Sequence, residues 1–134
     1  IDRAINDNEV CDVNPFGVIA TEAAYNEGEE WLNQLIDYIW GNYQYMRDFC
    51  HEHLPSFPIA DLEGTYLVWM DCSKLNTKSS ELEEQLIDEA KLWLNAGNLY
   101  GSAGEGFMRW NIACPRVTLV EGLSRFRRYV EKFT

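Results

Sequence analysis

The first half of the chain carries two apolar patterns with helical spacing. Apolar residues at positions 16, 19, 20, 23 and 24 predict a short helix from Phe16 to Tyr25, which residues 26–28 interrupt. A longer helix is predicted from about residue 28 to residue 53, because acidic residues open it and Pro55 follows its end. The apolar face expected for this helix consists of Trp31, Leu35, Ile39, Met46, Phe49 and Cys50.

Shorter apolar segments further along the chain predict strands. Residues 58–61 and 65–71 are predicted to form two strands joined by a turn at residues 62–64. Residues 66–70 are apolar at successive positions, and both faces of such a strand must be covered, so we expect it to lie in the middle of the sheet. Residues 92–95 predict another short strand.

Two capping motifs predict helices in the second half of the chain. Ser80 and Glu83 stand three residues apart, the spacing of a capping box, and predict a helix that ends near Lys91. Thr118 and Glu121 have the same spacing and predict the last helix of the chain. The apolar face expected for this last helix consists of Leu119, Leu123, Phe126 and Val130.

A loop with three glycines leads into a segment with strand periodicity. Residues 107–112 alternate with a period of two, so Arg109 shares one face with Phe107 and Asn111, while the other face is apolar. Pro115 ends the segment because it has no N–H to donate. An arginine in such a strand needs an anionic partner or access to water, because its charge cannot be neutralised. A structural ion pair, an edge-strand position and an anion-binding role all meet this need.

The order of predicted elements indicates the α+β class. A long helix precedes a small antiparallel or mixed sheet with helices packed on one face. The chain has 134 residues, 46% of them hydrophobic, which suits one packed domain. Residues 1–14 show no periodicity and are interpreted as a connector, and residues 15–134 as the domain. The first residue is Ile1 and not Met, which suggests an excised piece of a longer protein.

Charge and hydropathy narrow the range of partners. Residues 1–108 hold 5 basic and 20 acidic side chains, whereas residues 109–134 hold 6 basic and 2 acidic ones. The excess of acidic side chains in residues 1–108 argues against binding of nucleic acid or of an anionic membrane surface. No apolar run reaches the roughly 18 residues that a membrane helix needs. The basic side chains at residues 125, 127, 128 and 132 are interpreted as the solvated face of the last helix.

The cysteines and histidines do not form a metal-binding pattern. His51 and His53 would point in roughly opposite directions on a helix, and they complete no zinc motif. Cys114 is expected to be a structural thiol, because neither histidine lies near it in the sequence. Scattered thiols without C-x-x-C spacing favour a reducing cytoplasmic location; they lie at positions 11, 50, 72 and 114.

Four stretches of the chain together resemble one protein family. The sequence GEGFMRWNIACPR, which ends at Arg116, resembles the carboxyl-terminal signature of the class I/II aminotransferases, which are fold-type-I enzymes that use pyridoxal 5′-phosphate (PLP). The resemblance is strongest to the branch of cystathionine β-lyases and cysteine-S-conjugate β-lyases. Asn14–Leu32, Gly64–Asp71 and Leu94–Gly101 resemble the same branch, in the same order.

The resemblance implies a substrate-binding role for one arginine. In this family the arginine of the last motif binds the α-carboxylate of the amino-acid substrate, and that role falls on Arg109. Tyr100 lies in the preceding loop, which in the family lines the entrance to the substrate site. A tyrosine that merely packs the loop down is an equally good interpretation of Tyr100. The family resemblance also implies that the chain is the small carboxyl-terminal domain of a homodimeric enzyme of amino-acid metabolism.

The implied reaction needs groups that the sequence does not contain. In the family, PLP stabilises negative charge at the substrate Cα, and a thiol then leaves from Cβ of a cysteine conjugate. The lysine that bonds to PLP and the loop that binds its phosphate belong to the large domain of the same chain. None of the lysines here has the flanking sequence of the lysine that bonds to PLP; the chain contains Lys74, Lys78, Lys91 and Lys132. No catalytic or cofactor-binding residue is therefore assigned, and covalent PLP binding is not expected.

Two other interpretations remain open at this point. An aminotransferase would use the same parts, because the choice between lyase and aminotransferase depends on groups of the large domain. An acidic interaction module without chemistry would be favoured if no lysine-bearing domain preceded the chain.

Overall fold

The computed structural model describes residues 14–133 and divides the chain into two compact units, Ile1–Asp37 and Tyr38–Thr134. The connector expected over residues 1–14 lies outside the described residues, except for Asn14. The expectation that residues 15–134 form one domain stays a prediction.

In the first unit, the short predicted helix is confirmed as α2 (Pro15–Glu27). The Asn14 side chain accepts a hydrogen bond of 2.9 Å from the amide of Phe16, and Pro15 occupies the first turn, where its missing N–H costs nothing. The helix ends at Gly28, whose amide donates to the carbonyl of Ala24. A Cβ at Gly28 would collide with that carbonyl, which explains the glycine. No residue of α2 is buried.

The long predicted helix is α3 (Glu29–His53), which begins in the first unit and continues through the second. Its expected apolar face is only partly buried. Met46 and Cys50 are fully in the core of the second unit, whereas Trp31 is 68% exposed. Helical periodicity predicted the face correctly, but burial requires an opposing layer, and the described part of the first unit is almost entirely helix without a core of its own.

The second unit contains a three-stranded antiparallel sheet in the order β1-β3-β2. Its strands are β1 (Leu67–Asp71), β2 (Asn95–Ala96) and β3 (Phe107–Asn111). The central strand is therefore β3, and the expectation that residues 66–70 lie in the middle of the sheet is wrong. The expected strand over residues 58–61 is reduced to a single bridge between Ile59 and Met70. The segment around Ile59 still bonds to the outer edge of β1: the amide of Ala60 donates to the carbonyl of Trp69 at 2.8 Å, and the amide of Asp71 donates to the carbonyl of Pro58 at 2.9 Å.

Both expected capping boxes are absent from the described structure. The helix α4 (Ser79–Gln85) begins before Ser80, and the amide of Ser79 donates to Glu105, a residue distant in sequence. A helical turn, η2 (Leu86–Ala90), continues α4 to the predicted end near Lys91. The last helix, α5 (Arg116–Val130), begins directly after Pro115, so Thr118 lies inside its first turn. In each case the sequence predicted the helix, but its first residue is decided by other contacts.

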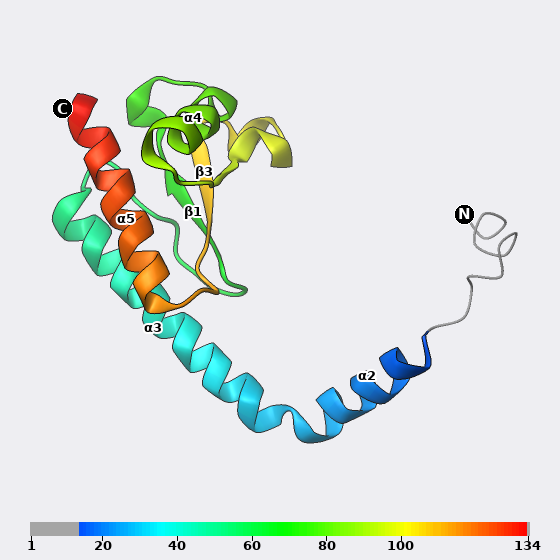
Figure 1. Ribbon diagram of the computed structural model, residues 1–134. Coiled ribbons are helices and arrows are strands. Elements are labelled where there is room, and N and C mark those ends of the chain that lie inside the picture. Colours follow the sequence, from blue (N-terminus) through cyan, green and yellow to red (C-terminus); the bar gives the residue numbers. More distant parts are fainter. Residues whose placement is uncertain (1–13, 134) are drawn as a thin grey trace, which may run out of the picture. The chain divides into compact units, whose positions relative to one another are not determined.

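The core lies between the sheet and the two long helices of the second unit, and Figure 1 shows α5 beside the carboxyl-terminal half of α3. Met108 and Trp110 of β3 are buried on the face that the sequence predicted to be apolar. Trp110 meets Phe126 of α5 edge to face, with ring centres 5.8 Å apart. All four residues expected on the apolar face of α5 are buried. The α+β class is confirmed.

Candidate functional site

Arg109 lies at the centre of the sheet, on the face turned away from this core. In the register of the sheet it is directly opposite Trp69 of β1 and Asn95 of β2. Directly opposed residues of antiparallel strands share one face, so the three side chains form a row across the sheet. The sequence predicted the face on which Arg109 lies. Trp69 and Asn95 were not singled out, because the pairing of the strands depends on loops whose lengths do not fix the register.

The guanidinium of Arg109 packs on an aromatic ring. Its Cζ atom lies 4.5 Å from the centre of the Tyr100 ring, a distance typical of a cation–π contact. Tyr100 in turn meets Trp69 edge to face, with ring centres 5.4 Å apart. Tyr100 is 50% exposed, so one side of this cluster is open to solvent. The structure therefore brings together the two residues that the resemblance assigned to substrate binding.

One donor of Arg109 has no acceptor. Its Nε is buried and makes no hydrogen bond, and within residues 14–133 no carboxylate forms an ion pair with the guanidinium. A buried N–H without a partner costs roughly 1–3 kcal/mol. Arginine cannot remove this cost by losing its proton. The site thus presents a positive charge without a carboxylate partner among the described residues, and a guanidinium can bind a carboxylate through two parallel N–H···O bonds.

The loop between β2 and β3 places Tyr100 over Arg109. Two short helical turns form it, η3 (Gly97–Tyr100) and η4 (Ser102–Gly104). Gly97 and Gly104 approach so closely that a Cβ on either would collide with the carbonyl oxygen of the other. The two ends of the loop therefore touch through their backbones, which only glycine permits. Tyr100 lies within this closed loop.

A second polar cluster joins α3 to the start of α5. The side-chain amide of Asn42, which is fully buried, donates to the carbonyls of Ile112 and Cys114 at 2.8 and 2.9 Å. Its oxygen accepts from Nε of Arg116 at 2.7 Å. The guanidinium of Arg116 also lies 5.0 Å from the centre of the Tyr45 ring. Every polar group of Asn42 is thus used in holding the segment that follows β3, which makes its role structural.

The described thiols of the second unit are unreactive in character: Cys50 and Cys72 are buried, and Cys114 is partly buried. Burial raises the pKa of Cys50 and of Cys72 to about 12, and it also raises the pKa of Cys114. A thiolate nucleophile needs a lowered pKa, so none of these three suits catalysis. The expectation that Cys114 is structural agrees with this. No cluster of three metal-ligating side chains occurs among the described residues, and His53 packs edge to face on Phe49.

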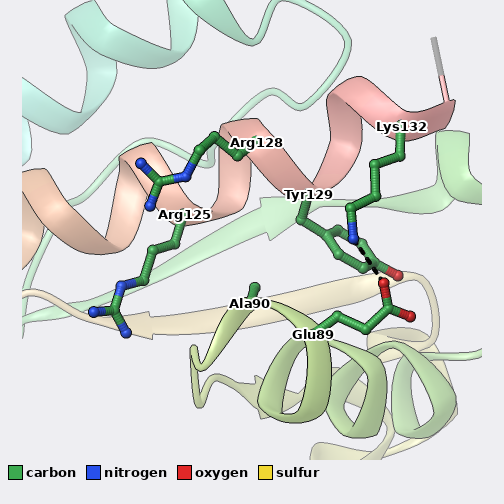
Figure 2. Close-up of a pocket in the computed structure, with 6 residues that line it drawn as sticks. All are labelled: Glu89, Ala90, Arg125, Arg128, Tyr129 and Lys132. Carbon is green, nitrogen blue, oxygen red and sulfur yellow. Dashed lines mark hydrogen bonds and ion pairs between the residues drawn. The ribbon is translucent and has the colours of Figure 1, made fainter.

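A cleft between η2 and α5 is lined by basic side chains. Figure 2 shows it, and its volume is about 120 Å³. Lys132 pairs with Glu89 across the cleft at 2.8 Å, and Arg125 pairs with Glu121 at 2.8 Å. Arg128 also pairs with Glu121, at 3.7 Å, so each of the three cations has a carboxylate partner within the protein. In Figure 2 the guanidinium groups of Arg125 and Arg128 do not converge on one point. This supports the interpretation of these residues as the solvated face of the last helix.

The lysines do not fit a PLP site. Each of the four is exposed, Lys91 donates to the carbonyl of Asp88, and Lys132 pairs with Glu89. Lys78 lies at the start of α4 and provides no side-chain cap. The residues of this chain therefore suit the carboxylate of a ligand at Arg109, but they include no buried lysine to which PLP could be bonded. In residues 14–133, none of the helices combines the length and apolarity needed to cross a bilayer.

Comparison with known proteins shows which proteins the chain and its fold are similar to. No family model matches the chain. It is 38% identical to cystathionine β-lyase PatB of Bacillus subtilis over 90% of its own length and 31% of the relative's length. The structure of cystalysin from Treponema denticola, which contains PLP, matches 92% of the chain and 31% of cystalysin, with 30% identity and a TM-score of 0.87. The PLP-bound C–S lyase from Staphylococcus hominis matches 95% of the chain and 35% of that enzyme, with 30% identity and a TM-score of 0.83.

The chain is therefore a relative of the fold-type-I PLP enzymes, in the branch of cystathionine β-lyases and C–S lyases. Its α+β fold corresponds to the carboxyl-terminal domain of these enzymes. The chain spans about a third of the length of the curated relatives it matches.

Proposed function

We propose that this chain is the carboxyl-terminal domain of a PLP-dependent carbon–sulfur β-lyase and that Arg109 binds the α-carboxylate of its cysteine-conjugate substrate. The observation that carries the proposal is the guanidinium of Arg109, which has a buried Nε–H without an acceptor and no ion-pair partner among the described residues. The likeness to C–S lyases supports the same assignment, because it extends over nine-tenths of the chain.

The proposed role of Arg109 is to bind and orient. Two parallel N–H···O bonds from one guanidinium fix both the position and the plane of a carboxylate. The plane matters because the carboxylate is attached to Cα, so its orientation decides which bond at Cα faces the cofactor. The ring of Tyr100 covers the guanidinium on one side and is itself packed against Trp69, so it limits the access of water, which would otherwise compete for the same donors.

The remaining parts of the enzyme are proposed to come from outside this chain. PLP supplies a sink for the electrons released at Cα, and its lysine and phosphate contacts would belong to the large domain. A second subunit would complete a homodimer, and the cytoplasm is the proposed location. The exposed apolar residues of α2 and of the first turns of α3 are the proposed contact with the large domain or with the other subunit.

The test of this proposal is kinetic and uses the full-length protein with a cysteine conjugate such as cystathionine. We expect Arg109→Ala to lower kcat/KM for release of pyruvate and ammonia by more than about tenfold, which corresponds to ~1.4 kcal/mol. Arg109→Lys should also be impaired, because an ammonium lacks the planar pair of donors. Arg127→Ala is the matched control, since Arg127 is an exposed arginine of α5 that pairs with Glu131. A loss of less than about tenfold in Arg109→Ala would show that Arg109 does not bind the carboxylate.

A second test concerns the cofactor. We expect the 134-residue chain alone neither to bond to PLP nor to turn over cystathionine, because its lysines are exposed and lie outside the Arg109 cluster. The measurement is the absorbance of PLP mixed with the chain. A stoichiometric band that disappears when one of the four lysines is substituted would contradict this expectation.

A further inference from the structure

The loop that carries Tyr100 is joined to α4 by a reciprocal pair of hydrogen bonds. The amide of Ser79 donates to Oε1 of Glu105 at 2.7 Å, and the amide of Gly106 donates to Oγ of Ser79 at 2.8 Å. Ser79 is 1% exposed, so the junction is largely shielded on the side of α4. Glu105 and Ser79 lie 26 residues apart in the sequence. The pair therefore connects two elements that are distant in the sequence.

Glu105 takes the place of a local helix cap. Lys78, the residue before α4, provides no side-chain hydrogen bond to the helix. The carboxylate of Glu105 instead accepts a hydrogen bond from the amide of Ser79 in the first turn of α4, where the helix dipole favours a negative charge. The bond to Ser79 lowers the pKa of Glu105, and the nearby charge of Lys78 acts in the same direction. A charged acceptor on a backbone amide is among the stronger hydrogen bonds in proteins.

The same junction determines where the loop can lie. Glu105 directly follows the point at which Gly97 and Gly104 touch, and Gly106 leads into β3. The carbonyl of Gly106 also accepts from the amide of Cys72 at 2.8 Å, which ties this end of the loop to the chain after β1. Between the two ends of the loop, Tyr100 contacts the sheet: its ring lies under the guanidinium of Arg109 and meets Trp69 edge to face. Holding its end at Glu105 therefore holds Tyr100 over the guanidinium.

We propose that Glu105 is a positioning residue for the substrate site: by fixing the end of the loop on Ser79, it keeps Tyr100 stacked on Arg109 and keeps the guanidinium in one orientation. The part of this inference that concerns the substrate rests on the proposed role of Arg109. The part that concerns the loop does not, because it depends only on contacts within this chain.

The first experiment measures the loop without substrate, by amide hydrogen exchange on the full-length protein. In Glu105→Ala we expect exchange over residues 98–104 to become about tenfold faster or more, because a charged hydrogen bond is lost at the end of the loop. Glu105→Gln keeps an acceptor oxygen without the charge and should restore part of the protection. Glu81→Ala is the matched control, because Glu81 is an exposed carboxylate in the same first turn of α4. If Glu105→Ala does not fold, Glu105→Gln is compared with the wild type instead.

The second experiment separates positioning from general stability. We expect Glu105→Ala to raise KM for the amino-acid substrate about fivefold or more while kcat changes less than about twofold, and Glu105→Gln to lie in between. Unchanged exchange over residues 98–104 overturns the inference whatever the kinetics show. Faster exchange with an unchanged KM, in a protein whose Arg109→Ala variant is impaired, also overturns it. If Arg109→Ala is not impaired, the proposed function fails by itself, and the exchange result alone decides whether Glu105 holds the loop.

Discussion

The guanidinium carbon of Arg109 lies 4.5 Å from the centre of the Tyr100 ring, and that ring meets Trp69 edge to face. The guanidinium therefore lies against an aromatic ring, and the negative potential of the ring face attracts its positive charge. The stacking restrains the side chain without using its N–H donors, because a ring face accepts no strong hydrogen bond from them. Arg109 is thus held in place, and among the described residues its buried Nε has no acceptor.

Removal of the Tyr100 ring should weaken the site without unfolding the protein. We expect Tyr100→Leu to lower kcat/KM of the full-length protein by about three- to tenfold, the range of a half-exposed cation–π contact of ~0.5–1.5 kcal/mol. Tyr100→Phe keeps the ring and should remain within about twofold of the wild type. The measurement is steady-state kinetics with circular dichroism to confirm folding. If Tyr100→Phe were as impaired as Tyr100→Leu, the hydroxyl and not the ring would be the important group.

Substitution of Asn42, unlike that of Tyr100, should cause a large loss of stability. Asn42→Ala would leave the carbonyls of Ile112 and Cys114 and the Nε of Arg116 without their partner. Buried unsatisfied groups cost ~1–3 kcal/mol each, so the free energy of unfolding should fall by roughly 2–4 kcal/mol. Urea unfolding measures this change, with Gln44→Ala as the control at an exposed position of the same helix. A loss no greater than that of the control would contradict the structural role of Asn42.

The sequence predicted which helices and strands form better than it predicted which of them lie side by side. Helical and strand periodicity located α2, α3, α5 and β3, because these patterns depend only on which face of an element is buried. The position of β1 at the edge of the sheet could not be predicted in the same way. A continuous apolar strand indicates cover on both faces, but it does not indicate which strands pair with its edges, and on its outer edge β1 has only a single bridge at Ile59.

At the site, too, the features that depend on neighbouring residues in the sequence were predictable, and those that depend on distant residues were not. Alternation placed Arg109 on the face away from the core, and the family resemblance suggested its role. The cap of α4 illustrates what local patterns miss: Ser80 and Glu83 have the correct spacing, but the amide of Ser79 is bonded to Glu105 instead. The contribution of Glu105 to the glycine loop could not be inferred without knowing that the loop returns to α4.

The apolar surface of α2 and of the start of α3 should cause the chain to associate. Phe16 is 80% exposed, Tyr25 is 87% exposed, and no residue of α2 is buried. Such surfaces on a soluble protein mark contacts with a partner. We expect sedimentation of the 134-residue chain to show concentration-dependent self-association.

Charged substitutions on this surface should reduce the association. Ile19→Glu places a charge among the exposed apolar residues of α2 and should shift the chain towards the monomer. Gln44→Glu adds the same charge at an exposed position of the second unit and serves as the control. A monomeric wild-type chain at all concentrations would contradict the expected contact role of α2.

The hydrogen bond between Glu105 and Ser79 should make stability depend on pH. In the folded protein the pKa of Glu105 lies below its ordinary value of 4.5, chiefly because the amide of Ser79 donates to its carboxylate. A carboxyl group with a lowered pKa stabilises the folded state above its ordinary pKa, and this stabilisation disappears as the pH falls through the folded-state pKa. The Tm of the wild type should therefore exceed that of Glu105→Gln near neutral pH, and the difference should shrink as the pH falls below 4.5. Comparison with the same difference for Glu81→Gln corrects for the removal of a charge near α4. A Tm difference between the wild type and Glu105→Gln that does not change with pH would mean that the charge of Glu105 does not contribute to holding the loop.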